Sequence, residues 1–342
     1  MKPLPINAAF VYLGFSLPKY FLKNIENFRE TFPHIPLWVV VDDSRMACYL
    51  RKRNFNVFIV GEQVVNNSKT LSKKLRHDVE FRAGFWVKTL TRFLAIRDLM
   101  QEQQISNVLH IEGDVLCFPT FPFEKFKSLK EELAFPLESP RLGIASILYV
   151  RDLKAVKRLC EFALDEVERD PTTTDMRVLG RYREEFKERV LVLPTFTCLE
   201  QVNERYINED LIHEILRSEK LFGGIFDSVS LGQYLFGIDP KNHRGIVKSF
   251  LVNSEHLINP QKYRFIDKRD SIAVETDEKN RLSDIYSLHI HSKDISAFSF
   301  PRNIGLIMKK YENSKHGISS RFSASTFISQ AIYAARRRLN AR

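Results

Sequence analysis

The stretch Val108-Leu109-His110-Ile111-Glu112-Gly113-Asp114-Val115 joins a short apolar run to two acidic residues separated by one glycine. An apolar run of this length predicts a strand, and the polar residues that follow predict where it ends. Both carboxylates therefore leave the strand at the same place. Hard divalent cations such as Mn²⁺ and Mg²⁺ prefer oxygen ligands of this kind. Glu112 and Asp114 are thus candidate metal ligands, although a polar turn that binds no metal has the same pattern.

Three earlier runs have the same form. Residues 8–13 end at Gly14, residues 37–41 end at Asp42 and Asp43, and residues 56–60 end at Gly61. Short apolar strands separated by helical segments indicate βαβ units and a mostly parallel sheet. Ligands bind at the carboxyl ends of such strands. We therefore expect Asp42 and Asp43 to share one crevice with the acidic pair and to bind the ribose or base of a nucleotide; capping of the next helix is the alternative.

The clearest helix is expected over residues 85–100, where apolar residues recur at helical spacing from Trp86 onward. A strand at 144–150 and helices at 153–168 and about 175–188 follow. Beyond Pro194 the pattern becomes irregular and rich in Gly, Asp and Asn, as loops around a site often are. The fold class is therefore α/β: one domain over residues 1–311, with a mixed, mostly parallel central sheet flanked by helices. Residues 312–342 are expected to form a linker and a basic amphipathic helix.

Charge and cysteine content limit the classes of partner and compartment. The 342 residues carry a net charge of +10, and residues 320–342 contain five arginines and no acidic residue. Charge concentrated in a tail argues against a nucleic-acid partner, which favours basic residues spread over a face. The tail suits an anionic membrane surface, with docking on protein as the alternative. Four cysteines without C-x-x-C spacing predict buried, reduced thiols. Lacking a membrane span or a signal-peptide pattern, the chain is expected in the cytoplasm, free or peripheral on the cytoplasmic face of a membrane.

A second group of candidate ligands lies in the stretch from Leu288 to Asp294. In a strand, His289 and His291 would point to the same face. Imidazole is a common ligand for Mn²⁺ and similar ions, and Lys293 could meet a phosphate oxygen as a point charge. Histidines in a core or on a surface are the alternative. The acidic pair together with a downstream His and Lys is more specific than either group alone.

These motifs resemble those of glycosyltransferases with the GT-A fold. Glu112-Gly113-Asp114 resembles their D-x-D motif, with Glu replacing the first Asp, and the helix containing Trp86, Lys88 and Arg92 resembles the segment before it. His291-Ser292-Lys293-Asp294 is similar to the H-S-R-D segment of β-galactosyltransferase-like enzymes, whose His completes the metal site. The resemblance implies that Asp114 and His291 are better ligand candidates than Glu112 and His289. It also implies that Lys88 or Arg92 and Lys293 contact the diphosphate of a nucleotide sugar.

The segment from Phe222 to Asn242 resembles a block found in bacterial GT-A-like proteins. In galactosyltransferase-like enzymes a comparable region holds the acceptor and the catalytic base, which implies roles for Gly224 and Gln233 at the nucleotide sugar. Glycines also allow close backbone approach to a ligand. Asp227 could act as general base for an acceptor hydroxyl, with capping of the following helix as the alternative. Glu209 is a rival for the same role.

The expected function is metal-dependent transfer of a sugar from a UDP-, GDP- or CMP-linked donor to a glycan or lipid-linked acceptor, with Mn²⁺ or Mg²⁺ as cofactor. Synthesis of surface polysaccharides or glycoconjugates is the expected setting. A nucleotidyltransferase acting on a sugar phosphate is the nearest alternative, but such enzymes usually need a Gly-rich phosphate loop, and residues 11–19 contain one glycine. A non-catalytic carbohydrate-binding protein is the other alternative.

Overall fold

The computed structural model describes residues 5–76, 84–237, 256–276, 281–298 and 304–315. The helices are α1 (Lys19–Thr31), α2 (Ser44–Arg51), α3 (Glu62–Lys74), α4 (Phe85–Glu102), α5 (Phe123–Phe126), α6 (Leu153–Arg169), α7 (Asp175–Glu185), α8 (Glu209–Phe222), α9 (Ser230–Phe236) and α10 (Ile304–Lys315). The strands are β1 (Asn7–Tyr12), β2 (Leu37–Val41), β3 (Asn56–Ile59), β4 (Val108–Ile111), β5 (Val115–Cys117), β6 (Leu133–Ser139), β7 (Leu142–Gly143), β8 (Ile147–Val150), β9 (Val190–Leu193), β10 (Gly224–Phe226), β11 (Phe265–Lys268), β12 (Ser271–Glu275) and β13 (Leu282–His289).

The larger sheet has the strand order β3-β2-β1-β4-β8-β6-β7, with β9 paired to β6. The half formed by β3, β2, β1 and β4 is parallel, and β8 runs antiparallel to both β4 and β6. Because β1 and β4 are parallel neighbours, their carboxyl ends lie side by side. This arrangement brings the loop after β1 next to the acidic turn after β4.

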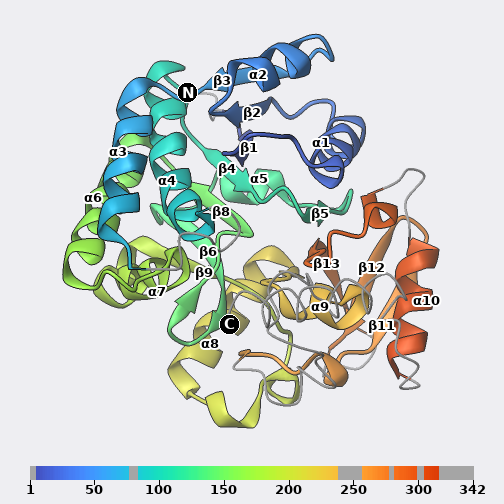
Figure 1. Ribbon diagram of the computed structural model, residues 1–342. Coiled ribbons are helices and arrows are strands. Elements are labelled where there is room, and N and C mark those ends of the chain that lie inside the picture. Colours follow the sequence, from blue (N-terminus) through green and yellow to red (C-terminus); the bar gives the residue numbers. More distant parts are fainter. Residues whose placement is uncertain (1–4, 77–83, 238–255, 277–280, 299–303, 316–342) are drawn as a thin grey trace, which may run out of the picture.

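Alternating side chains of the parallel strands pack into two apolar layers. Phe10 and Val39 belong to the layer that contains α1 and α2, whereas Ala9 and Val40 belong to the layer that contains α3, α4 and α6. In Figure 1 these two sets of helices lie on opposite sides of the sheet. Burial of both faces explains why these strands have continuous apolar sequences instead of alternating ones.

A second, five-stranded sheet has the order β10-β13-β12-β11, with β5 paired to the other edge of β13. It lies beside α9 and α10 in Figure 1. β5 begins directly after the acidic turn, and its antiparallel pairing places His289 opposite Val115. The link between the two sheets therefore brings the end of β13 to the acidic turn.

The predicted α/β fold, with a mixed and largely parallel sheet flanked by helices, is confirmed, and α4 and α6 match their expected ranges closely. The second sheet was not predicted, because its region has an irregular sequence pattern. The linker expected from residue 312 is helical as far as Lys315, where α10 ends. The rest of the tail, residues 316–342, lies outside the described residues. None of the helices in the described ranges is long and apolar enough to cross a membrane.

All four cysteines are free thiols, as expected, but only three are buried. Cys48 is exposed on α2, because its position falls on the face of the helix that turns away from the sheet. Burial raises the pKa of Cys160 to about 12. The Cys160 thiol is thus uncharged at neutral pH and packs as a small apolar side chain.

Candidate active site

A cleft of about 890 Å³ lies at the carboxyl ends of β1 and β4. Its walls come from the ends of β1, β4, β6 and β13 and from the starts of α1, α4 and α7, together with α9. Both predicted acidic residues, both histidines and Lys293 line it, as do Lys88, Arg92, Gln233, Tyr12, Tyr20, Phe21, Trp86, Glu138, Asp175 and Met176. The sequence rule that ligands bind where parallel strands end therefore locates the cleft correctly.

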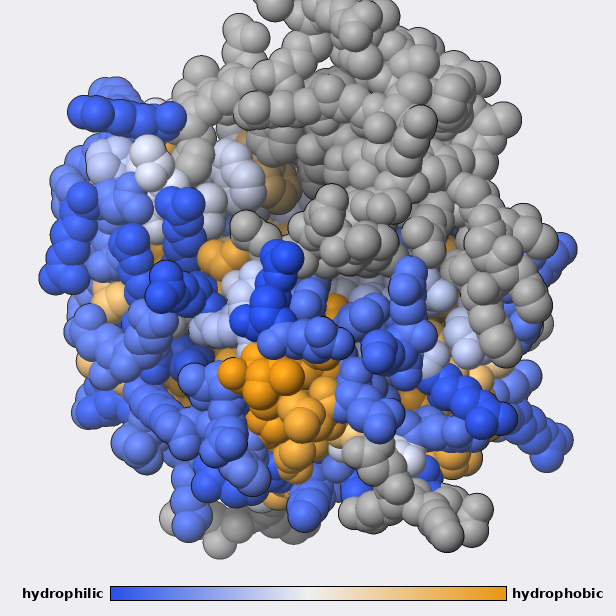
Figure 2. All heavy atoms as spheres, turned by 90° about the horizontal axis from the view of Figure 1, so that it is seen from below, coloured by the Kyte–Doolittle hydropathy of each residue, from blue (hydrophilic) through white to orange (hydrophobic). Residues whose placement is uncertain are grey.

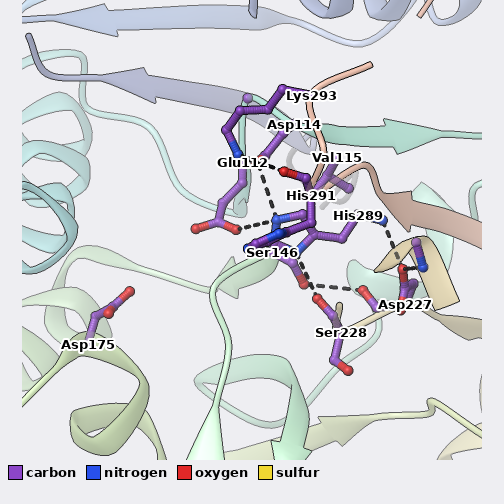
Figure 3. Close-up of polar contacts among 12 residues, drawn as sticks. Glu112, Asp114, Val115, Ser146, Asp175, Asp227, Ser228, His289, His291 and Lys293 are labelled. Atoms are coloured by element: carbon purple, nitrogen blue, oxygen red, sulfur yellow. Dashed lines mark hydrogen bonds and ion pairs between the residues drawn. The ribbon is translucent and has the colours of Figure 1, made fainter. Parts of the chain in front are cut away.

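Glu112, Asp114 and His289 converge in this cleft (Figure 3). Nε2 of His289 lies 3.3 Å from Oδ1 of Asp114 and 3.6 Å from Oε2 of Glu112. Within the described residues these three form the only group of at least three His, Cys, Asp or Glu residues whose ligand atoms all lie within 4.8 Å of one another. Two carboxylates and an imidazole form a donor set that suits Mn²⁺ or Mg²⁺.

The imidazole of His289 is held in one orientation. Its Nδ1 lies 2.9 Å from the carbonyl oxygen of Ser228, and because a carbonyl only accepts, Nδ1 carries the proton. Nε2 therefore faces the two carboxylates, which is the arrangement that metal-binding histidines commonly have. Burial alone would lower the pKa of His289, but the carboxylates of Asp114 and Glu112 raise it to about 9.

The cluster attracts cations. Nζ of Lys293 lies 2.5 Å from Oδ2 of Asp114. Burial alone would raise the pKa of Asp114, but Lys293 and His289 hold it well below its usual value. Gly113 is required between the acids, because a Cβ atom there would lie 2.2 Å from the ring of Phe21. A carboxylate such as Asp114 that stays ionised in a cleft fits a divalent cation, with Glu112, Asp114 and His289 as the residues that would hold it.

His291 has a different position from the one expected. β13 ends at His289, so His291 lies in the following turn and does not continue the strand. Its ring lies 5.8 Å from that of His289, centroid to centroid, and it lines the cleft without joining the three-residue group. The geometry therefore reverses the expected order of the two histidines and favours His289 as the ligand.

Arg92 was expected at the donor phosphates, but it is buried between two carboxylates. It pairs with Glu112 through one nitrogen and with Oδ2 of Asp175, at 2.7 Å, through another. Burial alone would lower the pKa of Arg92, but Glu112 and Asp175 raise it. Arg92 therefore fixes the position of Glu112 and anchors the start of α7 to α4. Asp175, the first residue of α7, shares this ion pair.

Asp227 was the preferred catalytic base, and the structure supports the capping alternative instead. Its side chain is completely buried and does not line the cleft. The carboxylate accepts hydrogen bonds from the backbone N–H groups of Leu231, Gly232 and His289, at 2.9, 2.7 and 2.9 Å. Asp227 lies on the opposite side of His289 from Glu112 (Figure 3). Three backbone donors therefore hold this carboxylate, and through them Asp227 positions His289 and α9.

Glu209 and Gly224 are also outside the cleft. Glu209 is exposed at the start of α8 and does not line the cleft. Gly224 begins β10, where a Cβ atom would lie 2.5 Å from both the backbone oxygen of Asp284 and the ring of Tyr286. The glycine is therefore needed for strand packing, not for approach to a ligand.

The acidic residues after β2 serve the backbone. Asp43 caps α2 by accepting from the N–H groups of Arg45 and Met46, both at 2.9 Å. Asp42 accepts from the N–H of Gly14 at 2.9 Å and so ties the loop after β1 to β2. Neither residue lines the cleft. Asp43 therefore caps a helix, which was the alternative to binding a nucleotide.

Besides Arg92 and Glu112, three predicted donor-binding residues line the cleft. Lys88, on the first turn of α4, makes no ion pair within the described parts of the chain. Gln233, on α9, is 7% exposed, and its Oε1 has no hydrogen-bond partner among the described residues. Lys293 adopts a left-handed backbone with φ of 60°, which turns its side chain back to Asp114.

The sequence reasoning missed Glu138 and the aromatic wall of the cleft. Glu138 lies near the end of β6, and Oε1 is 2.5 Å from Nδ1 of His256. Like Glu112, Glu138 is an acidic residue at the end of an apolar strand. The apolar run that starts at Leu133 could therefore have predicted it. Tyr12, at the end of β1, and Tyr20, on α1, gave no signal, because aromatic residues are common in any core.

No protein-family model matches this chain, and no curated protein matches its sequence. Solved structures with similar folds include the PaToxG glycosyltransferase, at 10% identity over 65% of this chain and 79% of that one, with a TM-score of 0.38. The galactosyltransferase LgtC in complex with donor and acceptor sugar analogs is 12% identical over 55% of this chain and 73% of that one, with a TM-score of 0.39. A cytidylyltransferase from Leptospira borgpetersenii is 10% identical over 64% of this chain and 97% of that one, with a TM-score of 0.34. Similarities this distant do not choose between these activities, and we base the functional proposal on the geometry of the site.

Proposed function

We propose that the protein is a glycosyltransferase that uses Mn²⁺ or Mg²⁺ to move a sugar from a nucleotide-sugar donor to the hydroxyl of a glycan or lipid-linked acceptor. The observation that carries this proposal is the convergence of Glu112, Asp114 and His289 in a cleft of about 890 Å³. A cleft of this size is in the range that encloses small-molecule ligands. A divalent cation bound there would neutralise the charge of the departing diphosphate.

Two lysines at the cleft suit the donor's phosphates. Lys293 already pairs with Asp114 at 2.5 Å, so its ammonium is held beside the proposed metal ligands. Lys88 lines the same cleft from the first turn of α4. An ammonium beside a phosphate oxygen forms a charge-assisted hydrogen bond, roughly twice as strong as a neutral one. Together they would orient the diphosphate and stabilise it as the bond to the sugar breaks.

Gln233 is suited to hold the donor sugar. Its Oε1 is buried, lacks a hydrogen-bond partner among the described residues and belongs to a side chain that lines the cleft. A buried acceptor without a donor costs about 1–3 kcal/mol, which a sugar hydroxyl would recover. Trp86 and Tyr20 also line the cleft and offer flat apolar surfaces for a base or sugar ring.

Glu138 replaces Asp227 as our candidate for the carboxylate that orients or deprotonates the acceptor hydroxyl. It lines the cleft, and no Arg or Lys of the described residues pairs with it; its partner is His256, at 2.5 Å. A general base must reach the proton that it removes. Among the other carboxylates in the cleft, Glu112 and Asp175 are committed to Arg92, and Asp114 to Lys293.

Product analysis tests this function against the nucleotidyltransferase alternative. The full chain is incubated with Mn²⁺ and UDP-, GDP- or CMP-linked sugars, and separately with nucleoside triphosphates and sugar phosphates. Release of free nucleotide from one sugar donor, abolished by EDTA and by Asp114→Asn, supports glycosyl transfer. Release of pyrophosphate from a triphosphate and a sugar phosphate would instead establish the nucleotidyltransferase.

A further inference from the structure

A second hollow, of about 1190 Å³, is lined by α7, the turn after β6 and the segment before α8. We call it the basic groove. The two hollows are lined by consecutive residues of the chain at two places: Glu138 and Met176 line the cleft, and Ser139 and Arg177 line the groove. Because consecutive Cα atoms are about 3.8 Å apart, a molecule bound in the groove would lie close to the cleft.

The lining of the basic groove has a strong excess of positive charge. The acidic residues in it are Glu184 and Asp210, and the basic ones are Arg141, Arg177, Arg181, Arg183, Lys187 and Arg205. Arg141, Lys187 and Arg205 are exposed and make no ion pair within the described part of the chain. Like charges gathered in a concave surface repel one another, and the potential they create attracts an anion.

Ion pairs behind the groove hold the arginines of α7 in place. Arg183 pairs with Glu214 of α8 at 2.5 Å, and Arg181 pairs with Glu166 of α6. Arg177 and Arg181 also lie 3.8 and 3.4 Å from Asp170. Fixed guanidinium groups lose little conformational entropy when they bind an anion, and their planar fork suits carboxylate and phosphate oxygens.

The backbone of the groove is also tightly fitted. A Cβ atom at Gly180 would lie 1.9 Å from the carbonyl oxygen of Arg141, so α7 can pack directly on the turn after β6 only because this residue is glycine. Arg141 and the arginines of α7 therefore keep a fixed spacing. Tyr206 and Ile207 add apolar surface to the lining, and the Ile207 side chain is 53% exposed.

The lining of the groove is largely hydrophilic, since charged and polar residues make up most of it. α7 and α8 lie at the lower left and bottom of Figure 1, and Figure 2 looks onto the molecule from that lower side. Most of the described residues visible on this face are hydrophilic, and apolar residues form a patch near its centre and smaller patches around it. A surface of this kind suits a charged, hydrated polymer better than an apolar partner.

We infer, given the glycosyl transfer proposed above, that the acceptor is an acidic glycan whose carboxylate or phosphate groups bind in the basic groove while its hydroxyl enters the cleft. The guanidinium and ammonium groups recognise anionic oxygens spaced along the chain, and Tyr206 offers its ring to the apolar face of a sugar. The groove's volume exceeds that of sites for drug-sized ligands, about 300–1000 Å³, as an oligosaccharide requires. Such a groove would give the enzyme selectivity for charged over neutral acceptors.

The test compares two triple variants that remove the same charge. Arg141→Gln, Lys187→Gln and Arg205→Gln together remove the unpaired cations of the groove. Lys52→Gln, Lys69→Gln and Lys73→Gln remove three exposed cations, one from the C-cap of α2 and two from the second half of α3. Calorimetry at low salt measures binding of hexagalacturonate, phosphorylated pentamannose and neutral dextran oligosaccharides to the full chain. Thermal unfolding verifies that each variant is folded.

We expect at least one acidic oligosaccharide to bind and the neutral one not to. The groove variant should lose roughly 30-fold in affinity, because it loses three charge-assisted contacts, and the control variant should stay within about twofold of the wild type. Three results would overturn the inference: equal losses of affinity in both variants, no loss in the groove variant, or groove-dependent binding of single-stranded RNA without glycan binding.

Binding of UDP and GDP with Mn²⁺, measured on the same samples, reports on the proposed transfer separately. If the protein binds acidic glycans through the groove but binds neither UDP nor GDP, the proposed sugar transfer is refuted and an acidic-glycan site remains.

Discussion

The backbone N–H of His289 donates a 2.9 Å hydrogen bond to Oδ2 of Asp227, and the same carboxylate caps the first turn of α9. One buried acid thus fixes both the histidine of the candidate metal site and the helix that carries Gln233. Burial raises the pKa of Asp227 above its usual value, while the three backbone donors favour the ionised form. The position of His289 therefore depends on a residue that does not touch the cleft.

Asp227→Asn should lower the free energy of unfolding by about 1–3 kcal/mol, because an amide group would face backbone donors that a carboxylate now satisfies. It should also weaken Mn²⁺ binding, since His289 loses its anchor. Asp43→Asn is the matched control: it alters a helix cap away from the cleft and should leave Mn²⁺ affinity unchanged. Full stability and normal Mn²⁺ affinity with lost turnover in Asp227→Asn would restore Asp227 as the catalytic base.

His289 and His291 should differ in their effect on metal affinity. His289→Ala removes a ligand of the three-residue group and should weaken Mn²⁺ binding at least about tenfold, since one ligand contact is lost. His291→Ala removes a ring that lies outside that group and should change the affinity less than about threefold. Calorimetric titration of both EDTA-treated variants measures this. The reverse order of losses would return the ligand role to His291.

Metal affinity should rise with pH. The carboxylates of Asp114 and Glu112, working against burial, raise the pKa of His289 to about 9, so below that pH a metal must displace a proton from Nε2. The apparent Mn²⁺ or Mg²⁺ affinity should therefore increase up to about tenfold per pH unit between pH 6.5 and 8.5. Titrations in buffers of different ionisation enthalpy should detect the released proton. His289→Gln should flatten this dependence, and an unchanged slope would contradict the assignment.

Arg92→Met should destabilise the fold by about 3–5 kcal/mol, because it leaves the partly buried carboxylate of Glu112 and the buried carboxylate of Asp175 without their cation. Adding Asp175→Asn removes one of the unpaired charges and should recover part of the loss. The two single variants and the double variant form a cycle, measured by urea unfolding. Additive effects would mean that Arg92 and Asp175 do not act as a pair.

Gly113→Ala should weaken metal binding and stability together, since its Cβ atom would lie 2.2 Å from Phe21 and displace the turn between the acids. Relief of such overlap typically costs about 1–3 kcal/mol. Gly305→Ala is the control, because nothing lies within 4 Å of its added Cβ on α10; it should be neutral or slightly stabilising. Thermal unfolding with and without Mn²⁺ separates the two effects.

The parallel half of the main sheet was predictable from the sequence, because strands such as β1 and β2 are buried on both faces and therefore have continuous apolar sequences. The second sheet was not predictable. Its strand β11 has exposed polar residues at Asp267 and Lys268, and β13 pairs with β5, a three-residue strand distant in sequence. Such pairing depends on tertiary contacts that no local pattern contains.

The candidate site was predictable only in part. Glu112 and Asp114 follow from a strand that runs into acids, but the choice between His289 and His291 depends on where β13 ends. Asp227 was ambiguous, because a helix-capping aspartate and a catalytic one can follow a glycine-rich turn in the same way. Burial and hydrogen-bond partners decide between these roles, and neither can be read from residue spacing.

Titration of nucleoside diphosphates into the EDTA-treated protein, with and without Mn²⁺, tests most directly whether Glu112, Asp114 and His289 hold a cation that binds the donor. For UDP or GDP, Mn²⁺ should raise the affinity at least about tenfold in the wild type, as expected for a metal that bridges protein and phosphate. The Asp114→Asn, His289→Gln double variant should lose this increase while keeping its fold by thermal unfolding. Equal nucleotide affinity with Mn²⁺ and with EDTA in the wild type, or an unchanged effect of Mn²⁺ in the double variant, would contradict the metal site.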